Sequence, residues 1–220
     1  MNWKAIFFDL DGTLVETAPE IADAVNDTLQ SLDQPLVDPK GMERWIGHGT
    51  RELLIQALAS VSGQSVAEVR ESEALLEALP VFDRHYQQRC GTRSHLYPHV
   101  RETLARLRAS DCRLAVVTNK EGRYTDTVLR AHQLTEAFDL IVSGDTFPVK
   151  KPDPVGVLHG LERWQVDKSQ ALFVGDSSID AATARRAGIK VWLLPYGYNM
   201  GEPVTACEPD RVIEDFSEIR

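Results

Sequence analysis

The chain has 220 residues, of which 43% are hydrophobic, and its formal net charge at pH 7 is −9. This length allows one large domain, or one domain with an insert. The negative charge argues against nucleic acid or an anionic membrane surface as the main partner. No apolar run is long enough to span a bilayer, and the first expected strand begins too early to leave room for a signal peptide. Together with three widely spaced cysteines that read as reduced thiols, this composition predicts a cytoplasmic globular protein.

The first feature along the chain is a short apolar run at residues 5–8, followed by Asp-Leu-Asp-Gly-Thr at 9–13. A continuous apolar run is typical of a strand that is buried on both faces. In an extended segment, residues i and i+2 point to the same side, so Asp9 and Asp11 can share one pocket. Two close carboxylates repel each other unless a cation or a shared proton lies between them. Mg²⁺ is the cation that best fits such oxygen ligands, although an ordinary Asp-rich turn is the simpler alternative.

Residues 17–88 show helical patterns and no convincing strand. Pro19 suits the first turn of a helix that runs to about residue 33. Thr50 is expected to cap a second helix. A further helical pattern begins near residue 65, and Pro80 is expected to kink or split it. The whole stretch is predicted to be a helical insert.

Beyond the insert, short apolar runs alternate with helical patterns. The expected strands lie at residues 114–117, 140–143, 171–174 and 191–194. This alternation indicates a parallel sheet that is covered by helices on both faces. The expected fold is therefore an α/β doubly wound, Rossmann-like core of residues 1–15 and 89–220, with the helical insert of residues 16–88 placed after the first strand.

Ligands bind at the carboxyl ends of the strands in such sheets, and polar side chains follow four of the expected strands. They are Asp9 with Asp11, Thr118 with Asn119, Lys151, and Asp176 with Asp180. Four such endings in this order resemble the four motifs of the haloacid dehalogenase superfamily, whose members are mostly phosphohydrolases. The resemblance covers essentially the whole chain.

The resemblance implies a role for each carboxylate. Asp9 would be the nucleophile that forms an aspartyl-phosphate intermediate. Asp11 would protonate the leaving oxygen and later deprotonate the attacking water. An Asp at position 11 favours a phosphatase or a phosphomutase, because superfamily members that cleave carbon–halogen bonds lack it and the ion-pumping ATPases carry Thr there. Mg²⁺ would be held by Asp9, Asp11 and Asp176.

The remaining motif residues would bind and stabilise the phosphoryl group. The hydroxyl of Thr118, with Asn119 beside it, would contact a phosphoryl oxygen. Lys151 would screen the charges of nucleophile and phosphate, while Lys150 is expected to be a solvated neighbour. Asp180 would either bind the metal through water or orient Lys151. Taken alone, these residues fit structural roles too, as a strand end or as a charge cluster at a helix N-terminus.

The helical insert resembles the C1-type cap of this superfamily, whose capped members act on small molecules under a lid that excludes water. Three segments resemble phosphoglycolate phosphatases: Gly-His-Gly at 47–49, the Tyr-Gly-Tyr-Asn loop at 196–203, and the ending at 212–216. The implied substrate is a small phosphorylated metabolite, with 2-phosphoglycolate as the leading candidate. Gly49 and Arg51 are expected beside it, near helix N–H groups that favour an anion. Arg51 fits equally well as a solvated helix charge.

Other functions remain open at this point. A β-phosphoglucomutase-like mutase, or a phosphatase for another sugar phosphate, would use the same four motifs. A non-enzymatic phospho-acceptor switch similar to response-regulator receivers also uses Asp, Thr, Lys and Mg²⁺. Receivers, however, lack the Asp-x-Asp-Gly-Thr segment and an insert of this length. The sequence is compatible with a monomer or a homodimer.

Overall fold

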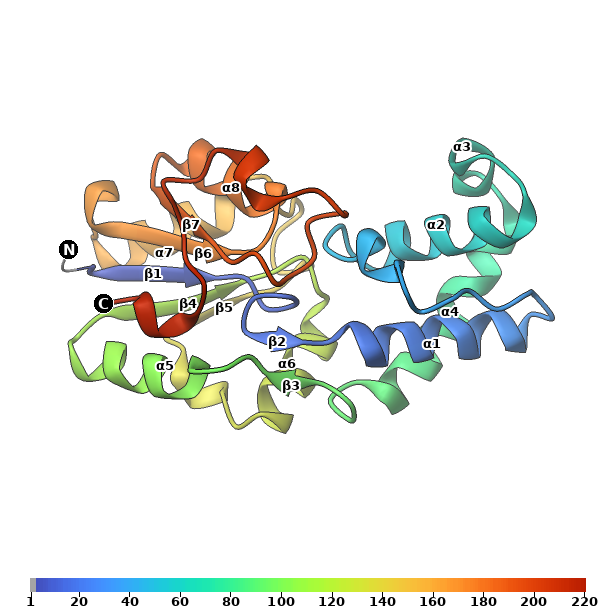
Figure 1. Ribbon diagram of the computed structural model, residues 1–220, viewed down its shortest axis with the longest axis horizontal. Helices are drawn as coiled ribbons and strands as arrows, with labels where there is room; N and C mark the ends of the chain where they lie inside the picture. The colour runs from blue at the N-terminus through green and yellow to red at the C-terminus, as the bar shows by residue number, and fades with distance from the viewer. Residues whose placement is uncertain (1–2) are drawn as a thin grey trace.

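The computed structural model describes residues 3–220, and Figure 1 shows an α/β layer at one end and a group of helices at the other. Strand β1 (Ala5–Phe8) opens the α/β layer, and the short strand β2 (Val15–Glu16) leads into the helices. These are α1 (Ala18–Ser31), the 3-10 helix η1 (Met42–Trp45), α2 (Thr50–Ser62), α3 (Val66–Arg70) and α4 (Glu73–Arg89). The short strand β3 (His95–Leu96) pairs antiparallel with β2 and returns the chain to the α/β layer.

The rest of the chain completes the α/β layer. Its strands are β4 (Arg113–Val117), β5 (Leu140–Val142), β6 (Ala171–Gly175), β7 (Lys190–Leu193) and β8 (Arg211–Val212). Its helices are α5 (Val100–Ala109), α6 (Gly122–Ala131), α7 (Val155–Trp164) and α8 (Ser178–Ala187). Four short 3-10 helices complete the connections: η2 (Thr135–Ala137), η3 (Lys168–Gln170), η4 (Val204–Cys207) and η5 (Phe216–Glu218).

The main sheet is parallel, with six strands in the order β5-β4-β1-β6-β7-β8. Strand β1 lies between β4 and β6, and Phe8 is paired with Val116 on one side and with Val174 on the other. The chain winds outward from β1 in both directions, so the predicted doubly wound α/β fold is confirmed. In such a fold the ligand crevice lies where the winding direction reverses, here at the carboxyl ends of β1, β4 and β6.

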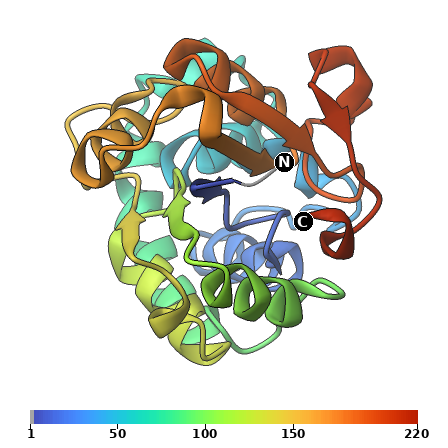
Figure 2. The ribbon, with the colours of Figure 1, turned by 90° about the vertical axis from the view of Figure 1, so that its left-hand side faces the viewer.

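Side chains of β1 alternate between two cores, one on each face of the sheet. Ile6 and Phe8 belong to the apolar cluster that includes α5 and α6, while Ala5 and Phe7 belong to the cluster that includes α7 and α8. All four side chains are fully buried. Figure 2 shows the two pairs of helices on opposite sides of the sheet. Burial on both faces explains why the strand is apolar at every position.

Between residues 17 and 88, all of which are described, the structure contains helices and no strand, as the sequence predicted. Helices α1 and α4 pack against each other along their length. The paired strands β2 and β3 mark the two crossings between these helices and the α/β layer. We retain as a proposal the division into a core of residues 1–15 and 89–220 and a cap of residues 16–88. No helix among the described residues is both long and apolar enough to cross a membrane.

The structure differs from the sequence at two helix features, a split expected at Pro80 and the N-cap expected at Thr50. Helix α4 continues through Pro80, and the break falls earlier, at Ser72, whose hydroxyl accepts the N–H of Leu75 at 3.2 Å. Pro80 is tolerated because the carbonyl that it leaves unpaired belongs to Leu76, which is 62% exposed on the same face. The N-cap of α2 is Gly49, not Thr50. Thr50 is the first helical residue, and its hydroxyl donates instead to Glu121 Oε2 at 2.9 Å.

Candidate active site

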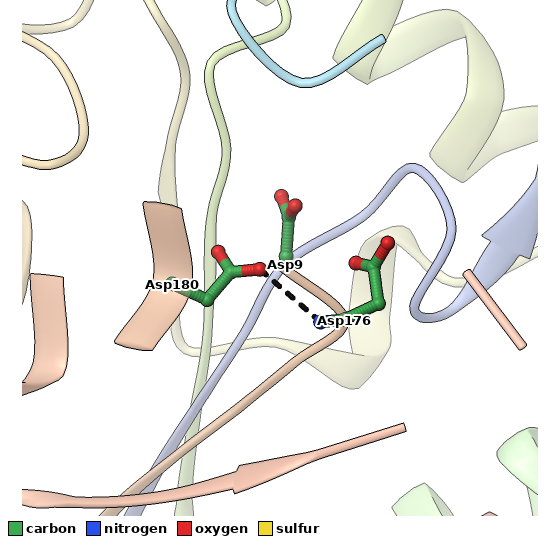
Figure 3. A group of neighbouring side chains, drawn as sticks. All are labelled: Asp9, Asp176 and Asp180. Atoms are coloured by element: carbon green, nitrogen blue, oxygen red, sulfur yellow. Dashed lines mark hydrogen bonds between the residues drawn. The ribbon is translucent and has the colours of Figure 1, made fainter. Parts of the chain in front are cut away.

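Three buried carboxylates gather where β1 and β6 end (Figure 3). Asp9 follows β1, Asp176 follows β6, and Asp180 lies in the first turn of α8. One carboxylate oxygen from each residue lies within 4.8 Å of the other two. Oxygen ligands of this kind are the set that Mg²⁺ prefers. Asp9 and Asp176 of the expected metal ligands meet here, and the third carboxylate of the group is that of Asp180 rather than Asp11.

Asp176 is held in a slot formed by two glycine-containing turns. The hydroxyl of Thr13 donates to its Oδ1 at 2.5 Å, and the backbone N–H of Tyr198 donates to its Oδ2 at 2.5 Å. A Cβ atom added at Gly12 would lie 2.4 Å from that Oδ2, and one at Gly197 would lie 2.2 Å from it. Neither position has room for a side chain. The turn after β1 and the Tyr-Gly-Tyr-Asn loop therefore close on the same carboxylate.

Lys151 lies between two of these carboxylates. Its Nζ is 2.8 Å from Asp9 Oδ1 and 2.7 Å from Asp180 Oδ1. The second oxygen of Asp180 accepts the N–H groups of Asp176 and Ser177, each at 3.1 Å, and the hydroxyl of Ser177 at 2.7 Å. Both oxygens of Asp180 are thus occupied. Its side chain contacts Lys151 and caps α8, which fits the role of orienting Lys151, while its place in the carboxylate group also keeps it near a bound ion.

The electrostatics of this cluster favour a cation. Burial raises the pKa of Asp9 above its ordinary range against the opposing charge of Lys151, and the charge of Asp180 adds to the rise. Burial also raises the pKa of Asp176, again with the charges of Asp180 and Asp9 adding to it. Burial alone would lower the pKa of Lys151, but the two carboxylates raise it and keep the ammonium charged. A divalent cation among the carboxylates would restore their ionised forms.

Asp11 is held by a second buried lysine, Lys120. The Nζ of Lys120 lies 2.9 Å from Asp11 Oδ1 and 3.0 Å from Asp11 Oδ2, and the hydroxyl of Thr17 donates to Oδ1 at 2.6 Å. Burial alone would lower the pKa of Lys120, but nearby negative charge, above all that of Asp11, raises it. Sequence patterns do not single out Lys120, because a lysine next to a motif reads as a solvated charge. Only the pairing of β4 with β1 brings it to Asp11.

Thr118 and Asn119 both follow β4 but make different contacts. The hydroxyl oxygen of Thr118 accepts the N–H of Lys120 at 3.2 Å, which leaves its own proton to donate. The side-chain amide of Asn119 donates to the carbonyl of Gly47 at 2.9 Å and to that of Lys151 at 3.1 Å. Its Oδ1 is buried without a hydrogen-bond partner among the described residues. Asn119 therefore ties the Gly47–Gly49 loop to the α/β layer.

A cavity of about 40 Å³ lies between the strand ends and the helices. Its α/β side is mostly polar and is lined by Asp9, Asp11, Thr118, Asn119, Lys120 and Glu121. Its helical side is mostly apolar and is lined by Ile21, Ile46, Gly47, Gly49, Thr50, Leu53, Phe82 and Tyr86. A ligand here would place a charged group against the strand ends and a small remainder against the helices.

The Gly47–Gly49 loop lies close to the α/β layer. A Cβ atom at Gly49, whose φ is +92°, would lie 2.9 Å from Lys150 Nζ. That Nζ donates to the carbonyl of His48 at 2.5 Å. Lys150 is exposed, but it also contacts this loop, and so it is not only the solvated neighbour that the sequence predicted.

Arg51 is not brought into the cavity. Its guanidinium donates to the carbonyl of Arg70 at 3.2 Å, and Arg51 lines a separate groove that also includes Lys150 and Met200. One residue farther along a helix points about 100° around its axis, so Thr50 and Arg51 face different ways. The expectation that Arg51 lies beside the substrate is therefore not supported by this structure.

Comparison with known proteins agrees with this geometry. The family profile of the haloacid dehalogenase-like hydrolases matches residues 6–194. The chain is 40% identical over 216 residues to a phosphoglycolate phosphatase of Nitrosospira multiformis, covering 98% of this chain and 93% of that protein. It is 38% identical to one of Photobacterium profundum, with the same coverage. A crystal structure described as a predicted phosphoglycolate phosphatase from Haemophilus somnus superposes with a TM-score of 0.93 at 34% identity, covering 100% and 97% of the two chains.

Proposed function

The chain belongs to the haloacid dehalogenase-like hydrolases and is a phosphatase, and we propose that it hydrolyses 2-phosphoglycolate to glycolate and phosphate with Mg²⁺ as its cofactor. The observation that carries this proposal is the single buried site in which Asp9, Lys151 and Asp176 meet at the ends of two adjacent strands. Relatives named phosphoglycolate phosphatases that match nearly the whole chain support this choice of substrate.

Asp9 is the nucleophile in the proposed reaction. Its Oδ1 accepts the N–H of Leu10 at 2.7 Å and lies beside the Lys151 ammonium, so its Oδ2 is the atom that attacks phosphorus. The attack forms the aspartyl-phosphate bond as the bond from phosphorus to the ester oxygen breaks. Lys151 offsets the negative charge that nucleophile and phosphate bring together, and the hydroxyl of Thr118 donates to a phosphoryl oxygen.

Asp11 transfers the protons. As a carboxylic acid it protonates the ester oxygen that leaves, so that glycolate departs as an alcohol. As a carboxylate it then takes a proton from the water that attacks the aspartyl-phosphate, which releases phosphate and regenerates Asp9. Asp11 lines the same cavity as Asp9, and this position suits both steps.

The charges of the site fit one Mg²⁺ ion. Four carboxylates (Asp9, Asp11, Asp176 and Asp180) stand against the ammonium groups of Lys120 and Lys151, which leaves two net negative charges. Asp9, Asp176 and the backbone carbonyl of Asp11 would hold the ion. When bound, Mg²⁺ would neutralise charge on the phosphoryl oxygens.

Mg²⁺ binding is expected to stabilise the fold through Asp176. An ion present at about 100 times its dissociation constant adds about 2.7 kcal/mol, and for a chain of this size Tm then rises by roughly 5–10 °C. In Asp176→Asn this rise should largely disappear, while the exposed Asp126→Asn should keep it. The measurement is thermal unfolding in EDTA and in Mg²⁺. Equal rises in wild type and Asp176→Asn would contradict the ligand assignment.

Substrate choice is proposed to lie in the Gly47–Gly49 loop and the start of α2. These groups line the helical side of the cavity, and the first N–H groups of α2 have no helical partner. Such N–H groups and the helix dipole favour an anion. The carboxylate of phosphoglycolate would occupy this position while its phosphate meets the strand ends.

We expect phosphate release from 2-phosphoglycolate to exceed that from sugar phosphates in a screen with Mg²⁺. Gly49→Val should lower kcat/KM for phosphoglycolate by about tenfold, or about 1.4 kcal/mol, because a β-branched residue is strained at the φ of +92° found here and would distort the loop. Hydrolysis of 4-nitrophenyl phosphate, which has no carboxylate, should change much less.

Arg51→Ala is the matched control, and the structure predicts wild-type values for it because its guanidinium lies outside the cavity. Equal losses on both substrates in Gly49→Val would assign the loop a purely structural role. Interconversion of sugar phosphates without phosphate release would instead identify a mutase.

A further inference from the structure

The second buried lysine of the site, Lys120, has no role in the reaction described so far. We propose that Lys120 is a positioning residue that fixes the carboxylate of Asp11 in the orientation from which it exchanges protons with the leaving oxygen and the attacking water. This inference rests on the proposed phosphatase function. It assigns Lys120 contacts with the Asp11 carboxylate but none with the phosphoryl group or the leaving oxygen.

Two donors hold the Asp11 carboxylate with three hydrogen bonds. Lys120 Nζ is bonded to both oxygens, at 2.9 and 3.0 Å, and Thr17 Oγ1 adds a third bond to Oδ1 at 2.6 Å. A donor shared almost equally by both oxygens holds the position of the carboxyl group, and the Thr17 bond to Oδ1 alone opposes rotation about its terminal torsion. The two side chains are 4% and 12% exposed, so water competes little for these bonds.

Lys120 is itself held from two sides. Its backbone follows β4 and donates to the hydroxyl of Thr118 at 3.2 Å. Its ammonium lies 5.0 Å from the centre of the Tyr86 ring, which belongs to α4 on the helical side of the cavity. A lysine bounded by both parts of the protein has few alternative positions, which is what a positioning role requires.

Each of the two reacting carboxylates also has its own lysine. Lys151 pairs with Asp9 and Asp180, while Lys120 pairs with Asp11. If one ammonium served both carboxylates, Asp9 and Asp11 would compete for it, and the orientation of one would depend on the charge of the other. Separate partners let Asp9 change from carboxylate to acyl phosphate while Asp11 stays in place.

The chemistry predicts which reaction step is slowed when Lys120 is replaced. Asp11 gives its proton to the ester oxygen as the bond between phosphorus and that oxygen breaks, and this help matters only when the departing oxygen is strongly basic. Phenolate is a stronger base than 4-nitrophenolate, and the two phosphate esters are otherwise alike and carry no carboxylate. The ratio kcat/KM includes steps only up to the departure of this group, so it isolates the first proton transfer from hydrolysis of the intermediate.

We expect Lys120→Met to lower kcat/KM for phenyl phosphate on the order of thirtyfold while kcat/KM for 4-nitrophenyl phosphate stays within about threefold of wild type. Lys120→Arg keeps a two-pronged donor and should recover most of the loss. Lys190→Met, the same replacement at an exposed lysine that pairs with Asp210, should match wild type on both esters.

A double-mutant cycle completes the test. If Lys120 acts through Asp11, then Lys120→Met should have little further effect on phenyl phosphate once Asp11→Asn is present. This double variant also removes both members of the buried pair, so it keeps the test available should Lys120→Met alone fail to fold with an unpaired Asp11 charge.

Equal losses on the two esters in Lys120→Met, or additive losses in the cycle, would overturn the inference and point to direct binding of phosphate by Lys120. In that case wild type still hydrolyses both esters with Mg²⁺, and the proposed function stands. If wild type releases phosphate from neither ester, the proposed function fails, and the positioning role fails with it.

Discussion

Asp9→Asn is expected to reduce phosphate release to background, a loss of at least about a thousandfold. Asparagine keeps the shape of the side chain and an oxygen that can accept the N–H of Leu10, but an amide oxygen does not form a phosphoryl ester that water can then cleave. The measurement is phosphate release with Mg²⁺ at saturating substrate, together with trapping of labelled phosphate on the protein. Retention of more than a few per cent of wild-type turnover would contradict the assignment of Asp9 as the nucleophile.

The stability of this variant separates lost chemistry from lost structure. The pKa of Asp9 is raised by burial, so above the unfolded-state pKa of an aspartate its ionised form opposes folding rather than favouring it. Asparagine removes that buried charge, and Lys151 retains Asp180 as a partner. Without Mg²⁺, Tm at pH 7 should therefore be no lower than in wild type.

The second large effect is expected at Lys151. Lys151→Met should lower kcat/KM by roughly a hundredfold to a thousandfold, the range found when a group that stabilises transition-state charge is removed. It also leaves Asp9 and Asp180 buried without their cation, and breaking such a pair costs about 3–5 kcal/mol. We expect Tm to fall in EDTA.

Lys150→Met is the control for Lys151→Met, because it makes the same change one residue away. Lys150 is exposed and contacts only a loop carbonyl among the bonds that the structure describes for it. Activity should fall at most about threefold, with little change in Tm. Equal losses in the two variants would mean that the loop after β5, rather than the Lys151 ammonium, is what catalysis requires.

The parts of the fold that follow local patterns were predictable. Strands β1, β4, β5, β6 and β7 are continuous apolar runs, and each was placed within one residue of its ends. Strand β8 and the β2–β3 pair were not predicted, because a strand of two residues has too little pattern to distinguish it from a loop. The continuity of helix α4 through Pro80 was not predictable for a related reason. A helix tolerates a proline on its exposed face, and packing decides which face is exposed.

The candidate site divides in the same way. Asp9, Thr118, Lys151 and Asp176 stand out because each follows an apolar run, and parallel strands end at one edge of a sheet. The same pattern does not reveal the contacts of Lys120 and Arg51. The importance of Lys120 depends on which strand lies beside β4, and the direction of Arg51 depends on where α2 begins relative to the loop before it.

The pairing of β2 with β3 has a consequence for how such proteins diversify. Val15 and Leu96 are register partners, so the two ends of the insert stand side by side at the edge of the α/β layer. The chain therefore leaves the α/β layer and returns to it at adjacent points, whatever the insert between them contains. Because the entropy of closing a loop grows only slowly with its length, helices between these strands can be lengthened, exchanged or re-sequenced with little cost to the sheet. The same strand-end chemistry can thus be combined with different helical inserts, because the two attachment points lie paired beside each other.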